Sequence, residues 1–165
     1  MPEFERGDVF GAYVPPIKDS VESPRPSYIL EGYHKFVMMH DSSDRDLPGK
    51  SVVALPITSL DKGTSRTFPS YVDLDKERHP FLDHKSYIST HQPVPLSRQW
   101  LGEILVGKIH PDKMLEVDLQ MIRTVGLERT LHGLIAHKLK EQLQEFERGM
   151  DQAASAREHP REPER

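Results

Sequence analysis

Short apolar segments, broken by turn residues, fill the first two thirds of the chain. The clearest is Ser51–Ile57, where a Val-Val-Ala-Leu run is followed by Thr58-Ser59. Residues of this kind favour strands, and the polar clusters between the segments favour turns. The predicted strands are Asp8–Val14, Ser27–Leu30, His34–His40, Ser51–Ile57, Ser70–Leu74, Ser86–Thr90 and Glu103–Ile109. Many short strands without long helices between them indicate a small barrel or a strongly bent sheet.

One proline falls inside the clearest strand. Pro56 has no amide hydrogen to give to a neighbouring strand. We therefore expect it at an edge or a bulge, because a proline in the interior of a central strand removes a ladder hydrogen bond.

The apolar period changes at Pro111, which suits the first turn of a helix. The spacing becomes helical over Met114, Val117, Met121, Ile122 and Val125, and again after Gly126 over Leu131, Leu134, Ile135, Leu139, Leu143 and Phe146. Two helices or one bent helix fit this pattern. The charged side of the second series, from Lys138 to Arg148, is expected to be a solvated face. Residues 151–165 hold nothing apolar larger than alanine, and we predict a disordered tail there.

Composition narrows the class of protein. The chain has 165 residues, of which 36% are hydrophobic, and this suits one domain with a modest core. It has no cysteine, so disulfides and thiolate metal sites are excluded. The first residues are too charged for a signal peptide and no apolar run is long enough for a membrane span, so we expect a cytoplasmic protein without membrane contact. The net charge of −4 is not that of a general nucleic-acid binder, so any RNA binding must depend on local cations and base contacts.

Several histidines and two aromatic residues each allow two interpretations, one functional and one structural. The chain has nine histidines, and His79 with His84, or His132 with His137, could pair on a metal. No third ligand follows at a recognised spacing, so surface histidines explain them better, and we expect no metal and no cofactor. Trp100 and Phe81 either stack on bases or fill the core of the small barrel.

Four short motifs occur in a fixed order along the chain. They are Arg6-Gly7-Asp8-Val9-Phe10, Arg25-Pro26, Ala54-Leu55-Pro56-Ile57-Thr58-Ser59 and Gln92-Pro93. The same motifs recur in the same order in the PemK/MazF toxins, which the chain resembles over roughly residues 6–125. The Gln92-Pro93 pair makes the chain more similar to the PemK/Kid branch of these toxins. The resemblance implies a mainly β fold with C-terminal helices, built on an SH3-like barrel of the CcdB/PemK type. We accordingly expect a barrel domain with a helix over residues 1–126, a helical extension over 127–150 and the tail over 151–165.

The resemblance also implies a function. These toxins form homodimers, cleave single-stranded RNA without a metal and are neutralised by a cognate antitoxin protein. The active-site arginine and threonine of the family correspond here to Arg25 and Thr58. The chain departs from the family at Gly11, where an aromatic residue is usual, and at Val94–Ser97, which replaces an Arg-Thr-Ile-Asp run. Ser89 and His91 stand where the PemK branch has an arginine and an aspartate.

The chemistry assigns a role to each candidate. Cleavage by the RNA's own 2′-hydroxyl needs a base, an acid for the leaving 5′-oxygen and donors for the phosphoryl oxygens. Arg25 suits the phosphoryl oxygens, Thr58 can donate to the same phosphate, and His91 suits proton transfer because histidine titrates near neutral pH. Lys18, Ser59 and Gln92 are expected to contact RNA.

Each candidate also has a structural interpretation. Arg25 between two prolines can be a solvated loop residue, Thr58-Ser59 can serve a turn, and His91 can simply shape the loop before Gln92. Two other functions follow from these interpretations. One is a CcdB-like toxin that poisons DNA gyrase by binding, and the other is an inactive member of the fold retained for regulation or assembly.

Overall fold

The computed structural model describes residues 2–15, 32–43, 50–59 and 68–158, with side chains up to residue 150. The expected strand Ser27–Leu30 and the candidates Lys18 and Arg25 lie outside these residues. The chain divides into two compact units, Met1–Val125 and Gly126–Arg165. Neither helix, within the described part of the chain, is long and apolar enough to cross a membrane.

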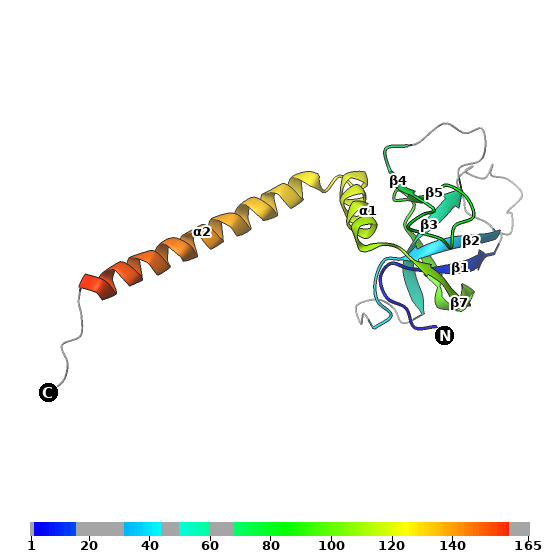
Figure 1. Ribbon diagram of the computed structural model, residues 1–165, viewed down its shortest axis with the longest axis horizontal. Coiled ribbons are helices and arrows are strands. Elements are labelled where there is room, and N and C mark those ends of the chain that lie inside the picture. The colour runs from blue at the N-terminus through cyan, green and yellow to red at the C-terminus, as the bar shows by residue number, and fades with distance from the viewer. Residues whose placement is uncertain (1, 16–31, 44–49, 60–67, 159–165) are drawn as a thin grey trace, which may run out of the picture. The chain divides into compact units, whose positions relative to one another are not determined.

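The first unit is an antiparallel sheet that bends on itself, followed by one helix (Figure 1). Its strands are β1 (Asp8–Val14), β2 (Gly32–Met38), β3 (Ser51–Ser59), β4 (Tyr71–Leu74), β5 (Ser86–Ser89), β6 (Val94–Ser97) and β7 (Leu101–Lys108), with a short 3-10 turn at Arg98–Trp100 before β7. The sheet order is β4-β5-β3-β2-β1-β7, and β6 also pairs with β3. The predicted mainly β fold with C-terminal helices is confirmed.

The predicted strands within the described residues are confirmed, with small shifts of their ends. β6 is the strand that the sequence analysis missed, because Pro95 lies inside it and a proline argues against a strand. Pro95 is tolerated because β6 is a short strand that, among the described residues, pairs on one side only, with β3.

β3 holds the sheet together by pairing with three strands. It pairs with β2 along one edge, while its other edge pairs first with β6 at Ser51–Ala54 and then with β5 at Ile57–Ser59. Pro56 falls between these two partners, so its missing amide costs no hydrogen bond on that edge. The expectation of an edge or a bulge is wrong, because Pro56 lies inside the central strand β3 and pairs with Phe36 of β2; the change of partner from β6 to β5 on the other edge makes room for it.

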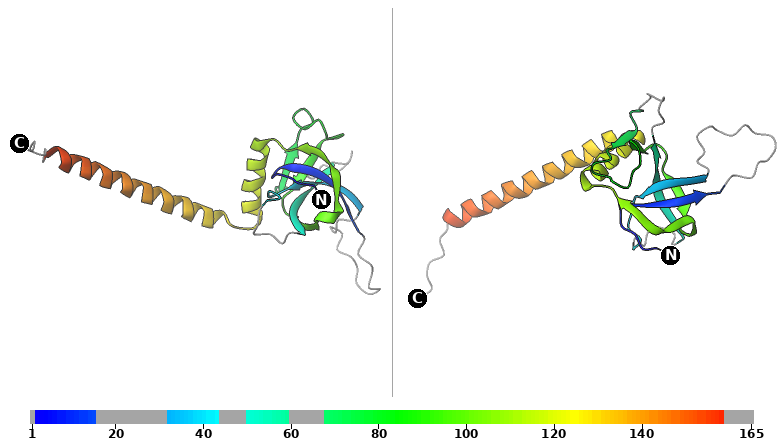
Figure 2. Two further views of the ribbon diagram at one scale, coloured as in Figure 1. Left: turned by 90° about the horizontal axis from the view of Figure 1, so that it is seen from below. Right: turned by 45° about the vertical axis from the view of Figure 1, so that its right-hand side comes forward.

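Two hydrophobic clusters lie on opposite faces of the central strands. Val9, Val37 and Leu55 belong to the first cluster, together with Met114 and Val117 of α1 (Pro111–Thr124). The ribbon of α1 lies beside the sheet (Figure 2). Alternate residues of the same strands form the second cluster, which the start of β7 and β6 cover; it contains Phe4, Phe10, Ala12, Phe36, Met38, Val52, Ala54, Leu96 and Leu101. Apolar side chains therefore pack on both faces of the sheet.

Register shifts between β1 and β7 produce part of this bend. Val9 pairs with Gly107 but Ala12 pairs with Leu101, with irregularities on both sides of Phe10. Extra residues in one strand of an antiparallel pair increase the local twist and turn the strand.

Two separate helices follow, which confirms one of the two predicted alternatives. α1 ends at Thr124, and Gly126 has a φ of +73°, a conformation that glycine adopts without the strain of a Cβ. α2 spans Glu128–Glu158, so it runs into the stretch 151–165 for which the sequence predicts disorder.

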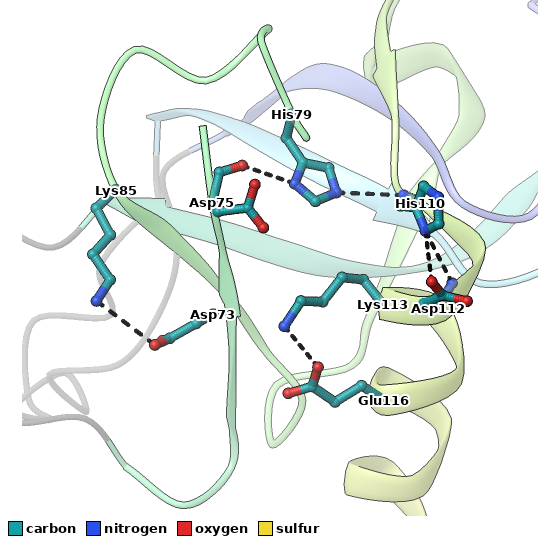
Figure 3. Close-up of polar contacts among 8 residues, drawn as sticks. All are labelled: Asp73, Asp75, His79, Lys85, His110, Asp112, Lys113 and Glu116. Atoms are coloured by element: carbon teal, nitrogen blue, oxygen red, sulfur yellow. Dashed lines mark hydrogen bonds and ion pairs between the residues drawn. The ribbon is translucent and has the colours of Figure 1, made fainter. Parts of the chain in front are cut away.

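A buried histidine links the turn after β4 to the start of α1 (Figure 3). His79 is 0% exposed, its Nδ1 lies 2.9 Å from the carbonyl oxygen of Asp75, and its Nε2 accepts from the amide of His110 at 3.3 Å. Because Nε2 accepts, the ring proton resides on Nδ1, which donates to Asp75. The Arg78 amide donates to the Asp75 carboxylate at 2.7 Å and lowers the pKa of that carboxyl, which reinforces the same turn.

We predict that His79→Ala destabilises the first unit by roughly 2–4 kcal/mol, because it removes two buried hydrogen bonds and opens a cavity. Chemical unfolding of the full chain measures this. The control is His84→Ala, an exposed histidine whose loss should cost less than about 0.5 kcal/mol. Equal stability of the two variants would contradict the linking role of His79.

Candidate functional site

A hollow of about 390 Å³ opens at the end of β3. It is lined by β2, by the last residues of β3 and by the segment leading into β5, through Tyr33, His34, Lys35, Ile57, Thr58, Ser59, Leu82, Asp83 and Ser86. Thr58 is half-buried and Ser59 is exposed. Two of the predicted site residues therefore lie in one concave surface, together with a cation and a histidine from the neighbouring strand.

Lys35 is held in this hollow by two contacts. Its Nζ donates to the carbonyl oxygen of Phe81 at 3.1 Å and lies 3.6 Å from Oδ2 of Asp83. The lysine side chain is 26% exposed, whereas that of Asp83 is 83% exposed, so the ion pair is at the rim and weak. An ammonium has three donors, so these two contacts leave one for a ligand as far as the described residues go.

Register places His34 beside Thr58. Lys35 pairs with Ile57 across β2 and β3, which makes His34 and Thr58 the next positions along the two antiparallel strands. Residues opposite each other in such a pair project from the same face of the sheet. The hydroxyl of Thr58 and the imidazole of His34 thus flank the same space.

Tyr33 explains the glycine at position 11. A Cβ on Gly11 would lie 1.9 Å from the hydroxyl oxygen of Tyr33, so the tyrosine ring occupies the space beside β1 where a side chain at position 11 would stand. An aromatic group at this rim of the hollow therefore comes from β2 instead of β1.

An aromatic face continues from Thr58 across the next two strands. Thr58 pairs with Tyr87, and Tyr87 stacks on Tyr71 with ring centroids 3.9 Å apart and an interplanar angle of 21°. Phe68, which is 51% exposed, meets the edge of Tyr71 at 5.2 Å. Stacked tyrosines with an exposed phenylalanine beside them form a surface on which flat ligands can stack.

His91 lies at the Tyr71 end of this face. It is exposed, its ring centroid is 5.5 Å from that of Tyr71, and its Nδ1 is 2.9 Å from the Ser70 hydroxyl and 3.1 Å from the Ser89 hydroxyl. Ser89 also donates to Oε1 of Gln92 at 3.4 Å. His91 and Gln92 belong to the corner where the chain passes from β5 to β6.

The predicted site residues thus form two groups. Thr58 and Ser59 share the hollow, and His91 and Gln92 share the corner, with the Tyr71–Tyr87 stack lying between the two groups. Arg25 and Lys18 are outside the described residues.

Sequence reasoning missed Lys35 and the two tyrosines. Their positions depend on the pairing of β2 with β3 and of β4 with β5, which no local pattern gives. A weak signal existed in the polar run Tyr33-His34-Lys35, which interrupts the apolar pattern at the start of a predicted strand.

Other candidates from the sequence have structural roles. Trp100 and Phe81 pack against the second and first core clusters, so their core-filling interpretation is correct. Both ring nitrogens of His79 are bonded to the main chain, and nowhere in the described residues do three histidine, aspartate or glutamate side chains gather as metal ligands.

Comparison with solved structures identifies the fold. An endoribonuclease in complex with its cognate antitoxin from a mycobacterial species is 20% identical, over 74% of this chain and 95% of its own, with a TM-score of 0.51. A second mycobacterial endoribonuclease is 19% identical, over 78% and 96%, with a TM-score of 0.53. MazF from Deinococcus radiodurans is 14% identical, over 76% and 99%, with a TM-score of 0.55.

These identities are low, so the likeness establishes a MazF-like fold without distinguishing branches of these toxins. No protein-family model matches the chain, and no curated protein does.

Proposed function

We propose that this protein is a sequence-selective endoribonuclease toxin that cleaves single-stranded RNA by metal-independent transesterification and is neutralised by a cognate antitoxin. The observation that carries the proposal is the end of β3, where Thr58 and Lys35 both line one hollow and Thr58 pairs with Tyr87 of the Tyr71–Tyr87 stack. Several solved structures of this fold are described as endoribonucleases, one of them in complex with its antitoxin.

The hollow supplies the groups that such a cleavage needs. The 2′-hydroxyl attacks the adjacent phosphorus, a new P–O2′ bond forms, and the bond to the leaving 5′-oxygen breaks. Negative charge on the phosphoryl oxygens is stabilised by donors that are already in place. Thr58 provides a neutral donor and Arg25 a bidentate cation for the same phosphate, and Lys35 adds a further cation to the hollow.

We assign proton transfer to His91. His91 takes the proton of the 2′-hydroxyl or gives one to the leaving oxygen, because histidine changes charge near neutral pH. The hydroxyls of Ser70 and Ser89 lie 2.9 and 3.1 Å from its Nδ1, and that of Ser89 also lies 3.5 Å from Nε2, so the two serines hold the orientation of the ring.

Binding of the strand rests on stacking as well as charge. The chain carries a net charge of −4, so long-range attraction for RNA is weak. Tyr71, Tyr87 and Phe68 offer aromatic surface for unpaired bases, a contact worth about 1–3 kcal/mol per base. Ser59, Gln92 and Lys18 complete the contacts to the strand.

The proposal predicts cleavage of single-stranded RNA by the purified full chain in the presence of EDTA. The products should carry 2′,3′-cyclic phosphate and 5′-hydroxyl ends, and a 2′-deoxy substitution at the cut site should block the reaction, because the nucleophile is then missing. Thr58→Val, prepared in parallel, controls for contaminating nuclease.

Strict dependence on magnesium would contradict the mechanism. Absence of cleavage by a folded protein would favour the alternatives, and inhibition of DNA gyrase by that same protein would select the CcdB-like one.

A further prediction concerns Lys35, the cation of the hollow. Lys35→Met keeps the unbranched stem of the side chain and removes its charge, so kcat should fall by roughly a hundredfold, with little change in stability. Arg25→Ala should produce a loss of similar size. The matched control is Lys113→Met, which breaks a surface ion pair with Glu116 on α1. Equal activity of the Lys35 and Lys113 variants would move the charge stabilisation elsewhere.

Another prediction concerns His91, the proposed proton carrier. The cleavage rate of the wild type should depend on pH, and His91→Gln should flatten that profile and lower the rate. His34→Gln serves as the comparison, since His34 lines the hollow itself. If His91→Gln preserves the wild-type profile and His34→Gln flattens it, the role belongs to His34.

A further inference from the structure

Helix α2 carries one continuous stripe of exposed apolar side chains. Ile135, Leu139, Leu143, Phe146 and Met150 follow one another at intervals of four, four, three and four residues, and their exposed fractions run from 49% to 68%. This spacing keeps all five on one face of an α-helix. A stripe of this size on an exposed helix calls for a partner surface.

Charged residues flank the stripe in a regular way. Lys138 and Glu145 lie along one flank, and Lys140 and Glu147 lie along the other, each lysine seven residues before its glutamate. Seven residues are about two helical turns, so each pair stays on its own side of the stripe. On both flanks the lysine precedes the middle of the stripe and the glutamate follows it.

These charged side chains contribute little to the stability of α2 itself. Lys138 reaches Glu141 at 3.5 Å, and both side chains are largely exposed, 71% and 49%. Such a pair contributes little. The arrangement of Lys138, Lys140, Glu145 and Glu147 is instead self-complementary under a two-fold axis through the middle of the stripe.

We infer that α2 is an interaction surface for the α2 of a second copy of this chain, with the two helices antiparallel and the two-fold axis near Gln142 and Leu143. This register places Ile135 of one copy against Met150 of the other, so the two stripes overlap from end to end. Lys138 then faces the partner's Glu145, and Lys140 faces the partner's Glu147.

Charge also selects the direction of pairing. In an antiparallel pair the same flank of each helix meets its counterpart, so each lysine meets a glutamate. In a parallel pair the Lys138 flank would lie along the partner's Lys140 flank, with lysine near lysine and glutamate near glutamate. Like charges at such positions oppose association.

The inference does not depend on RNA cleavage. It concerns α2 alone, and it is distinct from any contact between barrels.

Cysteine crosslinking of the full chain tests it, because the natural sequence has no cysteine that could interfere. Gln142→Cys lies next to the proposed two-fold axis and should give a covalent dimer with copper phenanthroline or a short bis-maleimide. Gln144→Cys, on the opposite side of the helix, is the control. We expect at least about tenfold more dimer from Gln142→Cys, since only near neighbours can be bridged.

The direction is tested by two further variants. Ile135→Cys alone and Met150→Cys alone should not crosslink, whereas a mixture of the two should. Adding Lys138→Glu and Lys140→Glu to the Gln142→Cys chain should reduce its dimer yield, because both flanks then carry only glutamates.

Three results would overturn the proposal. Crosslinking of Ile135→Cys with itself would indicate parallel helices. Equal yields from Gln142→Cys and Gln144→Cys would mean random collision. No dimer from Gln142→Cys with either reagent would leave the stripe to a different partner, such as an antitoxin.

Discussion

The structure depends on β3 pairing with two successive strands along a single edge. β6 takes the first half of that edge and β5 the second, and Pro56 occupies the place where one gives way to the other. A proline fits there because it has no amide hydrogen to lose. The connection between β5 and β6 must then turn a corner beside β3, and that corner is the segment that holds His91, Gln92 and Pro93.

The candidate site is a consequence of this arrangement. Because β5 pairs with the end of β3, Tyr87 stands opposite Thr58, and β4 then adds Tyr71 to the stack. Because β2 pairs with the other edge, Lys35 and His34 reach the same end of β3. Strands far apart in the sequence therefore bring donors, a cation and aromatic rings to the same end of β3. A protein with a net charge of −4 needs such a local cluster if it is to hold a polyanion.

The sequence predicts the elements of this fold better than their pairing. The strands at Asp8–Val14 and Ser51–Ser59 have clear apolar runs that end at turn residues, and the helical period after Pro111 is equally plain. β6 was not predicted, because a strand of four residues with a proline inside it is too short to show an alternating apolar pattern. Thr58 could be proposed from its motif, whereas Lys35, Tyr71 and Tyr87 are separated from it along the chain and meet it only through sheet register.

The central claim is that single-stranded RNA lies across the end of β3 and over the tyrosine stack. NMR titration of isotopically labelled protein with an RNA oligonucleotide made uncleavable by 2′-deoxy substitution tests it most directly. The account predicts the largest shifts at Thr58, Lys35 and His91 and in the rings of Tyr71 and Tyr87, with α2 unchanged. Shifts confined to α2, or none at saturating oligonucleotide, would contradict it.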